Sequence, residues 1–419
     1  MIVDGYSTGG FLVPAFARLG VPVVHVLSTS EPRPSMAPPD LAGYIACLTC
    51  PDEAAFTATA SAISSYQPLA VLPGSEAGVP MADRLSEHLG LATNGTLLSP
   101  ARRDKYAMIE TLRAAGVRCA RQFSSSDPSA VLAWAAGEGD APVVIKPLSS
   151  ASSQNVRICR GAVEIDEAVR EVLAATTMFG DANHAALAQS YLEGTEYVVD
   201  TVSSRGQRRI CGVWEYEKET GEGGRPLYDR DVLLDPDDAP VPQLIDYVDT
   251  VLEALGICHG PAHAEVIMTP DGPTLVEIAA RLNGNLDPGF HDRCLDANQV
   301  DLTALAYARP DDFRKRFGNT VYSRLRHGAV YNTRTRSAGV VTGVDAAVVA
   351  RIAALPTVHQ VKTRLSRGRR IRPTVDLLSS PLRVFMVGDD AATLRADHQA
   401  VAALEDNVYH VRPDAGPAR

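Results

Sequence analysis

The sequence lacks the features that mark several large classes of protein. It holds 40 Lys and Arg against 50 Asp and Glu, and the net charge of −10 makes it a poor candidate for binding nucleic acid or an anionic membrane. No stretch approaches the ~18 consecutive apolar residues that a membrane helix needs. The N-terminal residues also lack the cationic and apolar segments of a signal peptide. We therefore expect a cytoplasmic protein with no nucleic-acid or membrane partner.

Cysteine is scarce and irregularly placed. The chain of 419 residues has 7 cysteines, and this odd, scattered set does not resemble a disulfide framework. Cys47 and Cys50 form a lone C-x-x-C motif, which we interpret as two buried thiols in or after a strand. The rest of the composition, 45% hydrophobic and 21% charged, is ordinary for a globular chain of two or three domains.

The first hundred residues alternate between short apolar segments and helical ones, with Gly-marked loops between them. This order predicts an open parallel sheet, whose ligands lie at the carboxyl ends of the strands. Residues 4–10 and 74–76 follow two of the expected strands and would line such a pocket. The loop 6–10, "YSTGG", lacks the G-x-G-x-x-G spacing of a dinucleotide-binding loop, so we interpret it as a turn that lines a substrate pocket.

A new unit opens at Ser99, which is a suitable N-cap for a helix that has Pro100 in its first position and ends at Gly116. Farther along, the apolar strand "VVIKP" ends at Lys146 and is followed by a loop of small residues, "SSASSQN", at 149–155. A lysine at a strand end before such a loop is suited to binding phosphate through its amine and the backbone N–H groups.

Two later segments are predicted to be irregular. Residues 217–238 are rich in Gly, Pro and charge, which predicts a mobile loop or lid. Residues 362–372, "KTRLSRGRRIR", form the one basic run, which we interpret as a solvated loop.

The stretch "AEVIMTPDGPTLVEIAARLNGN" predicts a β-hairpin with acidic residues on both strands. If residues 270–272 form a three-residue loop, Glu265 lies directly opposite Glu277. Like charges opposite each other are unfavourable, by roughly 3 kcal/mol at ~5 Å and an effective dielectric of ~20. Glu277 also lies in the apolar run "TLVEIAA", where an unpaired charge would be costly.

A cation between the two glutamates would account for them. Mg²⁺ prefers carboxylate oxygens and shares its remaining positions with substrate phosphates. Asn283 adds a neutral oxygen ligand, and Arg281 adds a fixed positive fork. This set suits a site that holds a metal-bound triphosphate while a phosphoryl group is transferred, and Lys105 and Lys146 are candidates to bind its phosphates.

These motifs, in this order and spacing, resemble those of ATP-grasp enzymes over roughly residues 1–320. The resemblance implies an α/β fold in which an N-terminal open parallel-sheet domain (1–98) precedes a two-lobed ATP-grasp unit. Its small lobe would span 99–185, its large lobe with the metal site 186–318, and a C-terminal α+β lid domain 319–419.

The resemblance also assigns roles to individual residues. Lys105 and Lys146 would contact the ATP phosphates, with Lys146 also near the adenine, and Glu196 would bind the ribose hydroxyls. Loop 149–155 has no Gly where the family's phosphate loop is Gly-rich, and Ser152 and Ser153 in it would be further ATP contacts. The hinge that pairs with the adenine edge would be Gln189, Ser190, Tyr191 and Leu192.

The same resemblance places the metal and the transferred group. Glu265 and Glu277 would hold two Mg²⁺ ions, for which Mn²⁺ is an expected substitute, with Asn283 on one of them. Arg281 would stabilise the phosphoryl group in flight. His263, two residues from Glu265, would lie on the same strand face and help position the amine. Asp4 and Glu76 are further candidates, for the ammonium group of a substrate.

The segments "HGPAHAEV" and "EIAARLNGN" look closest to the L-amino-acid (dipeptide) ligases of this superfamily. The implied reaction joins two amino acids through an acyl phosphate, releases ADP and phosphate, and serves specialised amino-acid or peptide biosynthesis. A homodimer is compatible with the resemblance. The alternatives are a γ-glutamyl product, a biotin-carboxylase-like or purine-pathway ATP-grasp enzyme, and an ATP-binding sensor without catalysis.

Overall fold

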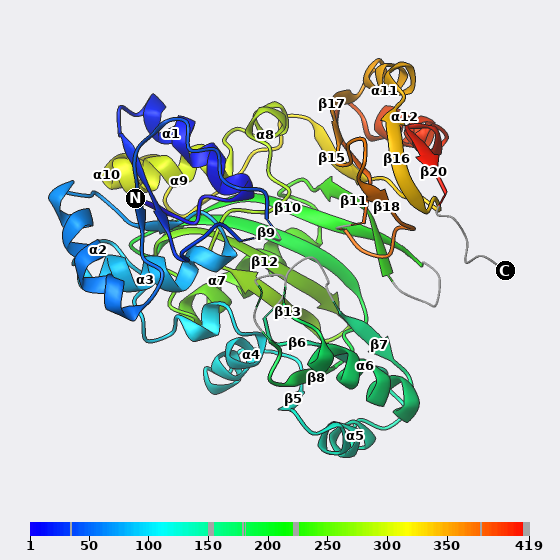
Figure 1. Ribbon diagram of the computed structural model, residues 1–419, viewed down its shortest axis with the longest axis horizontal. Coiled ribbons are helices and arrows are strands. Elements are labelled where there is room, and N and C mark those ends of the chain that lie inside the picture. The colour runs from blue at the N-terminus through cyan, green and yellow to red at the C-terminus, as the bar shows by residue number, and fades with distance from the viewer. Residues whose placement is uncertain are drawn as a thin grey trace. The chain divides into compact units, whose positions relative to one another are not determined.

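A computed structural model describes residues 1–33, 36–149, 155–177, 180, 182–220, 226–377 and 379–413, and the chain divides into two compact units (Figure 1). Unit 1 comprises Met1–Val213, Pro236–Pro288 and Ala297–Tyr322, and unit 2 comprises Trp214–Asp235, Gly289–Asp296 and Ser323–Arg419. The division into four domains expected from the sequence stays a prediction. Among the described residues, no helix is both long and apolar enough to cross a membrane.

Unit 1 begins with the expected open parallel sheet. Its strands pair in the order β3-β2-β1-β4, all parallel. One face packs on α2 and α3 through residues such as Val3, Ile63 and Leu85, and the other packs on α1 and α9. The elements are β1 (Ile2–Val3), α1 (Leu12–Arg18), β2 (Val23–Leu27), β3 (Tyr44–Thr49), α2 (Glu53–Ser65), β4 (Leu72–Pro73), α3 (Val79–His88) and α9 (Gln299–Ala308).

The expectation that Cys47 and Cys50 are both buried is wrong for Cys47. Cys50 is buried, but Cys47 is exposed, because β3 is an edge strand whose residues alternate between partly buried and exposed positions. A thiol at an outward-facing position of an edge strand points to solvent whatever its hydrophobicity.

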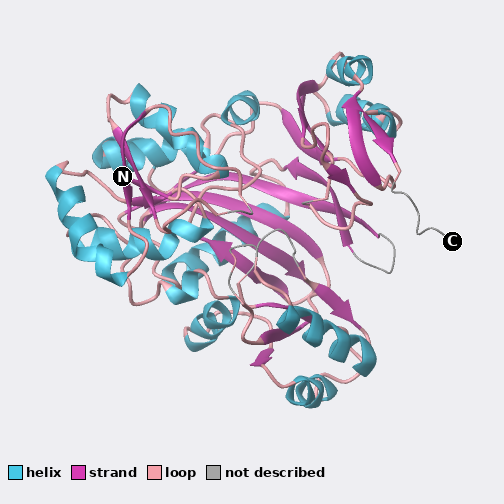
Figure 2. Cartoon of the chain, in the orientation of Figure 1, coloured by secondary structure: helices cyan, strands magenta, loops and turns pink. Residues whose placement is uncertain are grey.

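A second, antiparallel sheet follows in the order β5-β8-β6-β7. Helices α5 and α6 cover it, and Figure 2 shows both on the same side, where Val131, Ile145 and Val169 share one core. The strands are β5 (Gln122–Ser125), β6 (Val143–Pro147), β7 (Arg157–Cys159) and β8 (Ala186–Ser190), and the helices are α5 (Pro128–Ala136) and α6 (Ala162–Ala174). Lys146 therefore lies near the end of β6, as expected.

The helix expected to start at Ser99 starts later. Residues Pro100–Arg102 form a short 3-10 turn, and α4 (Lys105–Ala114) begins behind Asp104, whose carboxylate accepts a hydrogen bond from the N–H of Ala107 at 2.8 Å. Ser99 instead donates its hydroxyl to Asp83 at 2.6 Å. Asp104 is the better-placed cap, and Lys105 consequently occupies the first helical position.

The third sheet of unit 1 carries the glutamate hairpin. Its strands lie in the order β13-β12-β9-β10, and β14 pairs with β10. Helices α7 and α9 both pack against β9 and β12, and α10 packs against α9. The bounds are β9 (Thr195–Ser204), β10 (Gln207–Thr220), α7 (Pro240–Ala254), β12 (Gly260–Thr269), β13 (Gly272–Ala279), α10 (Pro310–Phe317) and β14 (Thr320–Val321).

Unit 2 contains two antiparallel sheets. In the first sheet, the end of β10 pairs with β11, and the strand order continues as β11-β15-β19-β17. The second sheet has three strands in the order β18-β16-β20. The hydrophobic core of unit 2 includes Ile352, Val384 and Val401. The elements are β11 (Pro226–Leu233), α8 (Pro288–Cys294), β15 (His327–Asn332), β16 (Gly339–Val344), α11 (Ala346–Ala353), β17 (Val358–Thr363), β18 (Arg370–Ile371), β19 (Leu382–Gly388), α12 (Ala391–Ala402) and β20 (Tyr409–Arg412).

The prediction of a loop or lid at 217–238 is wrong for most of that segment. Residues 217–220 end β10 and 226–233 form β11, and the two strands pair with a bulge between Glu217 and Lys218. Their charges misled the sequence interpretation, because Arg230 pairs with Glu217 and the ammonium of Lys218 lies 4.6 Å from the centre of the Tyr228 ring. The tip at 221–225 lies outside the described residues.

The basic run also contains regular structure at both ends. Lys362 belongs to β17 and Arg370 to β18, so the predicted solvated loop is limited to the residues between these strands.

A buried ion pair in unit 1 gives a prediction for stability. Arg102 is fully buried, and its guanidinium donates to the carboxylate of Asp83 at 2.9 Å and to the carbonyl of Leu255 at 3.1 Å. Arg102→Met leaves a buried carboxylate without its cation, so we expect the free energy of unfolding to fall by about 3–5 kcal/mol in urea denaturation. Adding Asp83→Asn should recover part of this loss, and a double variant as unstable as the sum of the singles would contradict the pairing.

Candidate functional site

Glu265 and Glu277 lie opposite each other in the β12–β13 hairpin, as the sequence predicts. The three-residue loop used to derive this is wrong, because Thr269 pairs with Gly272 and only two residues turn the corner. A bulge leaves Val276 unpaired and shifts the pairing by one residue, so that Glu265 faces Glu277. Without the bulge, Glu265 would face Val276. A bulge next to a functional residue commonly re-aims a side chain in this way.

The positive group next to Glu277 is Lys105, whose ammonium forms an ion pair with the Glu277 carboxylate. The first position of α4 fixes Lys105, and its backbone N–H donates to the carbonyl of Leu148 at 2.9 Å. Burial disfavours the ammonium, but attraction by Glu277 outweighs it, so the pKa of Lys105 lies above its ordinary value. Burial likewise opposes ionisation of Glu277, but Lys105 holds its pKa below the ordinary range.

Arg281 lies two residues beyond the end of β13 and forms a second ion pair, with Glu76. The Nε atom of Arg281 lies 3.0 Å from the Glu76 carboxylate, and another guanidinium nitrogen donates to the Leu282 carbonyl at 2.8 Å. Glu76 opens the short turn after β4, at the carboxyl end of the parallel sheet. The two residues that the sequence assigned to separate tasks are therefore in direct contact.

His263 points to the same side as Glu265, as expected from their spacing. Its Nδ1 lies 2.8 Å from the carboxylate of Asp200, and its Nε2 lies 3.4 Å from Glu265. Burial disfavours the charged ring, but the two carboxylates outweigh burial and raise the pKa of His263 to about 9. His263 thus contacts carboxylates with both nitrogens.

Asp200 is a residue of this site that the sequence interpretation missed. It is only 3% exposed on β9, and its second oxygen accepts a hydrogen bond from the side-chain amide of Asn283 at 2.9 Å. The amide oxygen of Asn283 accepts from the N–H of Asn285 at 2.8 Å. The signal available in the sequence was an acidic residue in the apolar strand "EYVVDTV", which would be costly to bury unpaired.

A second cluster joins Lys146 to Gln189 on neighbouring strands of the small sheet. The ammonium of Lys146 donates to the Gln189 side-chain oxygen at 2.9 Å, and both residues are buried. The amide nitrogen of Gln189 is buried and has no hydrogen-bond partner among the described residues. Burial and repulsion by Lys105 lower the pKa of Lys146 to about 8.

Two residues of the expected hinge already use their backbone N–H groups in hydrogen bonds within the protein. The N–H of Ser190 donates to the Arg121 carbonyl at 2.9 Å and that of Tyr191 to the Pro142 carbonyl at 3.3 Å, so neither is available to pair with an adenine. These contacts exclude the N–H groups of Ser190 and Tyr191 from the expected pairing with an adenine. Glu196 is buried on β9, opposite Ile267 of β12.

Asp4 does not fit a substrate contact. It is fully buried, and its carboxylate accepts hydrogen bonds from the N–H and hydroxyl of Ser28 at 2.9 and 2.5 Å. Asp4 therefore links the ends of β1 and β2 instead of facing a ligand. Ser152 and Ser153, with most of loop 149–155, lie outside the described residues.

The donor set suits Mg²⁺ bound together with phosphates. Among the described residues, no group of three His, Cys, Asp or Glu side chains is arranged to hold a metal alone. Glu265, Glu277 and the amide oxygen of Asn283 supply only part of an octahedron, and Mg²⁺ typically takes one or two carboxylates and completes its shell with water and phosphate. The amide nitrogen of Gln189, which has no partner in the part of the chain that the structure describes, similarly offers a hydrogen-bond donor to a ligand beside Lys146.

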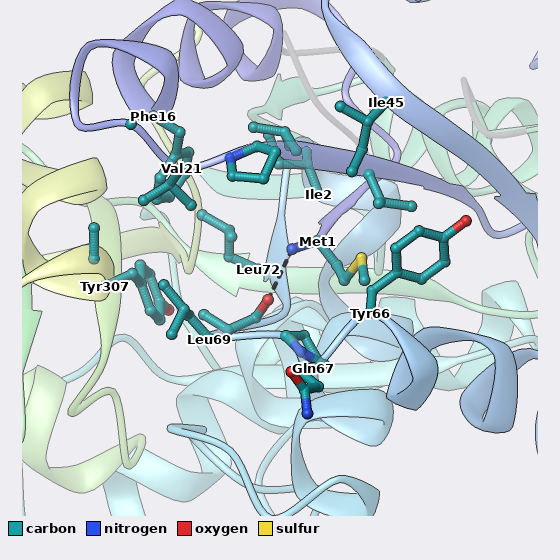
Figure 3. A pocket seen from close by; sticks show the side chains of 17 residues that line it. Met1, Ile2, Phe16, Val21, Ile45, Tyr66, Gln67, Leu69, Leu72 and Tyr307 are labelled. Carbon is teal, nitrogen blue, oxygen red and sulfur yellow. Dashed lines mark hydrogen bonds between the residues drawn. The ribbon is translucent and has the colours of Figure 1, made fainter.

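An apolar cavity of about 230 Å³ in unit 1 is separate from this site. Figure 3 shows it lined by Met1, Val21, Leu69 and Tyr307, among others, with the N-terminal amine bonded to the Ala70 carbonyl at 2.8 Å. Met1 and Val21 precede β1 and β2, so the cavity lies at the amino ends of the parallel strands. Ligands of open parallel sheets bind at the opposite ends, and none of the charged groups above lines this cavity.

Comparison with known proteins agrees with this geometry. Residues 139–287 match the family described as ATP-grasp domain. The chain is 32% identical over 413 residues to dapdiamide A synthase of Enterobacter agglomerans, covering 98% of this chain and 96% of that protein.

Solved structures share the fold at lower sequence identity. An L-amino acid ligase from Bacillus licheniformis superposes with a TM-score of 0.77 at 18% identity, covering 99% of this chain and 98% of that one. A phosphoribosylglycinamide synthetase from Anaerococcus prevotii gives 0.66 at 14% identity, with coverage of 99% and 98%. The chain therefore belongs to the ATP-grasp family, and it is an ATP-dependent ligase that forms C–N bonds.

Proposed function

We propose that this ligase joins two amino acids through an acyl phosphate, releasing ADP and phosphate, in specialised amino-acid or peptide biosynthesis. The observation that carries the proposal is the facing pair Glu265 and Glu277 with Lys105 and Arg281 beside it. Lys105 and Arg281, together with Mg²⁺ held by the two carboxylates, would neutralise the triphosphate and the charge that moves during phosphoryl transfer. Near-full-length similarity to dapdiamide A synthase supports an amide-forming reaction over other ATP-dependent chemistries.

The proposed chemistry has two steps. An oxygen of the first amino acid's carboxylate attacks the γ-phosphorus of ATP, the bond to the β-phosphate oxygen breaks, and ADP leaves. The amine of the second amino acid then attacks the carbonyl carbon, loses a proton, and expels phosphate that retains the former carboxylate oxygen. Both steps move negative charge, so fixed cations aimed at the transferring group are the main source of acceleration.

Each cation has a distinct place in this scheme. Lys146 and Gln189 would bind the nucleotide from the small sheet, and Lys105 would bind its phosphates from the start of α4. Arg281 would contact the transferring phosphoryl group, with Glu76 fixing the plane of its guanidinium at 3.0 Å. Lys105 would then exchange part of its interaction with Glu277 for the phosphates.

Glu265, Glu277 and Asn283 would hold Mg²⁺, with Mn²⁺ as a substitute. When bound, the metal supplies Lewis-acid polarisation and charge neutralisation at the phosphate oxygens. The hairpin supports this role because both carboxylates are only partly exposed, at 20% and 21% of their side chains. Limited exposure keeps the dielectric low and strengthens their attraction to a cation.

The amino-acid substrates are proposed to bind at the carboxyl end of the parallel sheet. Glu76, which begins the turn after β4, is the carboxylate available there for a substrate ammonium, shared with Arg281. Activation of a side-chain carboxylate, which would give a γ-glutamyl product, is compatible with the same residues. A non-catalytic sensor is disfavoured, because nucleotide binding alone does not require Arg281.

The substrates can be identified by the products. We expect phosphate release from ATP and Mg²⁺ with one or more pairs from a panel of amino acids, and a product whose mass equals the two amino acids minus water. Tandem mass spectrometry of the product distinguishes an α-linked from a γ-glutamyl amide. Phosphate release that depends on bicarbonate or on a ribonucleotide amine, with no amino-acid amide, would favour the biotin-carboxylase-like or purine-pathway alternatives.

Loss of the Glu277 carboxylate should abolish turnover. Glu277→Gln keeps the shape but removes the charge toward Mg²⁺, so we expect kcat to fall by more than about 100-fold. Because Lys105 loses its ion pair, the free energy of unfolding should fall as well, which a stability measurement on the same sample will show. Glu253→Gln on α7, where the side chain is 72% exposed, is the matched control and should leave kcat unchanged.

Nucleotide affinity should depend on the protonation of Lys146. Its pKa is lowered from 10.5 to about 8, so the ammonium is present below that pH and lost above it. We therefore expect ADP affinity, measured calorimetrically, to be constant below about pH 8 and to fall by up to about tenfold per pH unit above it. Lys146→Arg should retain its affinity to higher pH, and an equally steep fall in that variant would exclude Lys146 as the titrating group.

A further inference from the structure

Asp200 contacts two residues of the candidate metal site, His263 and Asn283. It is on β9, whose neighbour β12 carries His263 directly opposite it in the register. Its side chain is almost fully buried, and each of its two oxygens contacts a different residue of the site. A buried carboxylate is costly to desolvate, and both of its oxygens are matched by donors here.

The first oxygen fixes the imidazole of His263. The 2.8 Å contact between Asp200 and Nδ1 fixes which ring edge faces Asp200, so that Nε2 is directed toward Glu265 at 3.4 Å. His263 thereby lies between two carboxylates, with one ring nitrogen toward each. This differs from the sequence expectation that His263 positions the amine of a substrate.

The second oxygen fixes the amide of Asn283. Because Asp200 accepts from the amide nitrogen at 2.9 Å, the amide oxygen must point the other way, where it also accepts the N–H of Asn285 at 2.8 Å. An amide oxygen has two lone pairs, so one remains for a cation. The backbone N–H of Asn283 is held separately, by the side chain of Gln299 at 3.0 Å.

We propose that Asp200 is a positioning residue that sets the geometry of two metal ligands, Glu265 through His263 and Asn283 directly. The third ligand, Glu277, is held by Lys105. The inference rests on the proposed assignment of Glu265, Glu277 and Asn283 to Mg²⁺, and it deepens that assignment. Groups that orient metal ligands typically change metal affinity by about 10- to 100-fold when replaced.

The test is metal affinity in the absence of turnover. Mn²⁺ binding to the full chain saturated with ADP, without amino acids, is followed by electron paramagnetic resonance and by competition with Mg²⁺. Asp200→Asn removes the negative charge and replaces one oxygen with an NH₂ group, so the side chain can no longer accept hydrogen bonds from both Asn283 and a protonated His263. We expect Mn²⁺ affinity to fall by about 10- to 100-fold and the KM for Mg²⁺ to rise in parallel.

Asp83→Asn is the matched control, because Asp83 is also a buried carboxylate of unit 1 that accepts two side-chain hydrogen bonds. It should lower thermal stability and leave Mn²⁺ affinity unchanged. Unchanged Mn²⁺ affinity in Asp200→Asn would overturn the proposal. If that variant does not fold, His263→Gln decides, since it interrupts the path to Glu265: weaker Mn²⁺ binding supports the proposal and wild-type binding overturns it.

This measurement is independent of the proposed dipeptide product. A protein that binds Mn²⁺ and ADP but couples no amino acids would refute the proposed reaction while leaving the role of Asp200 intact. The reverse result, amide formation with a metal site indifferent to Asp200, would refute only the positioning role.

Discussion

The candidate site of unit 1 depends on keeping two carboxylates on facing positions of one hairpin. A bulge at Val276 brings Glu277 opposite Glu265, and the resulting repulsion requires a positive group close by. Lys105 supplies it from the start of α4, held by a backbone contact to Leu148. The ion pair explains how the hairpin is stable as it stands, and it holds in place a site that a metal-bound triphosphate would complete.

The surrounding charges follow from the same constraint. Arg281 is paired with Glu76, and Asp200 is shared between His263 and Asn283, so these two carboxylates hold groups from other parts of unit 1. Each contact fixes an orientation before substrate arrives. Preorganised groups of this kind need little rearrangement during phosphoryl transfer, which is the main way in which a protein accelerates that reaction.

Much of this arrangement could be predicted from the sequence, because it follows from local order. The parallel sheet, the strand that ends near Lys146 and the pairing of Glu265 with Glu277 are confirmed, although the pairing was derived with a loop one residue too long and without the bulge. Asp200 was missed because its role depends on a neighbouring strand distant in sequence. The β10–β11 hairpin was mistaken for a loop because its charges are paired across the strands, which composition does not reveal.

The transfer of a carboxylate oxygen to phosphate tests the proposed acyl phosphate most directly. Amino acids labelled with ¹⁸O in the carboxylate are incubated with ATP, Mg²⁺ and the enzyme, and the released phosphate is analysed by mass spectrometry. The proposed mechanism predicts one ¹⁸O atom in each phosphate formed together with an amide product. Unlabelled phosphate, or label appearing in AMP, would contradict the account, because the carboxylate oxygen would then not have attacked the γ-phosphorus.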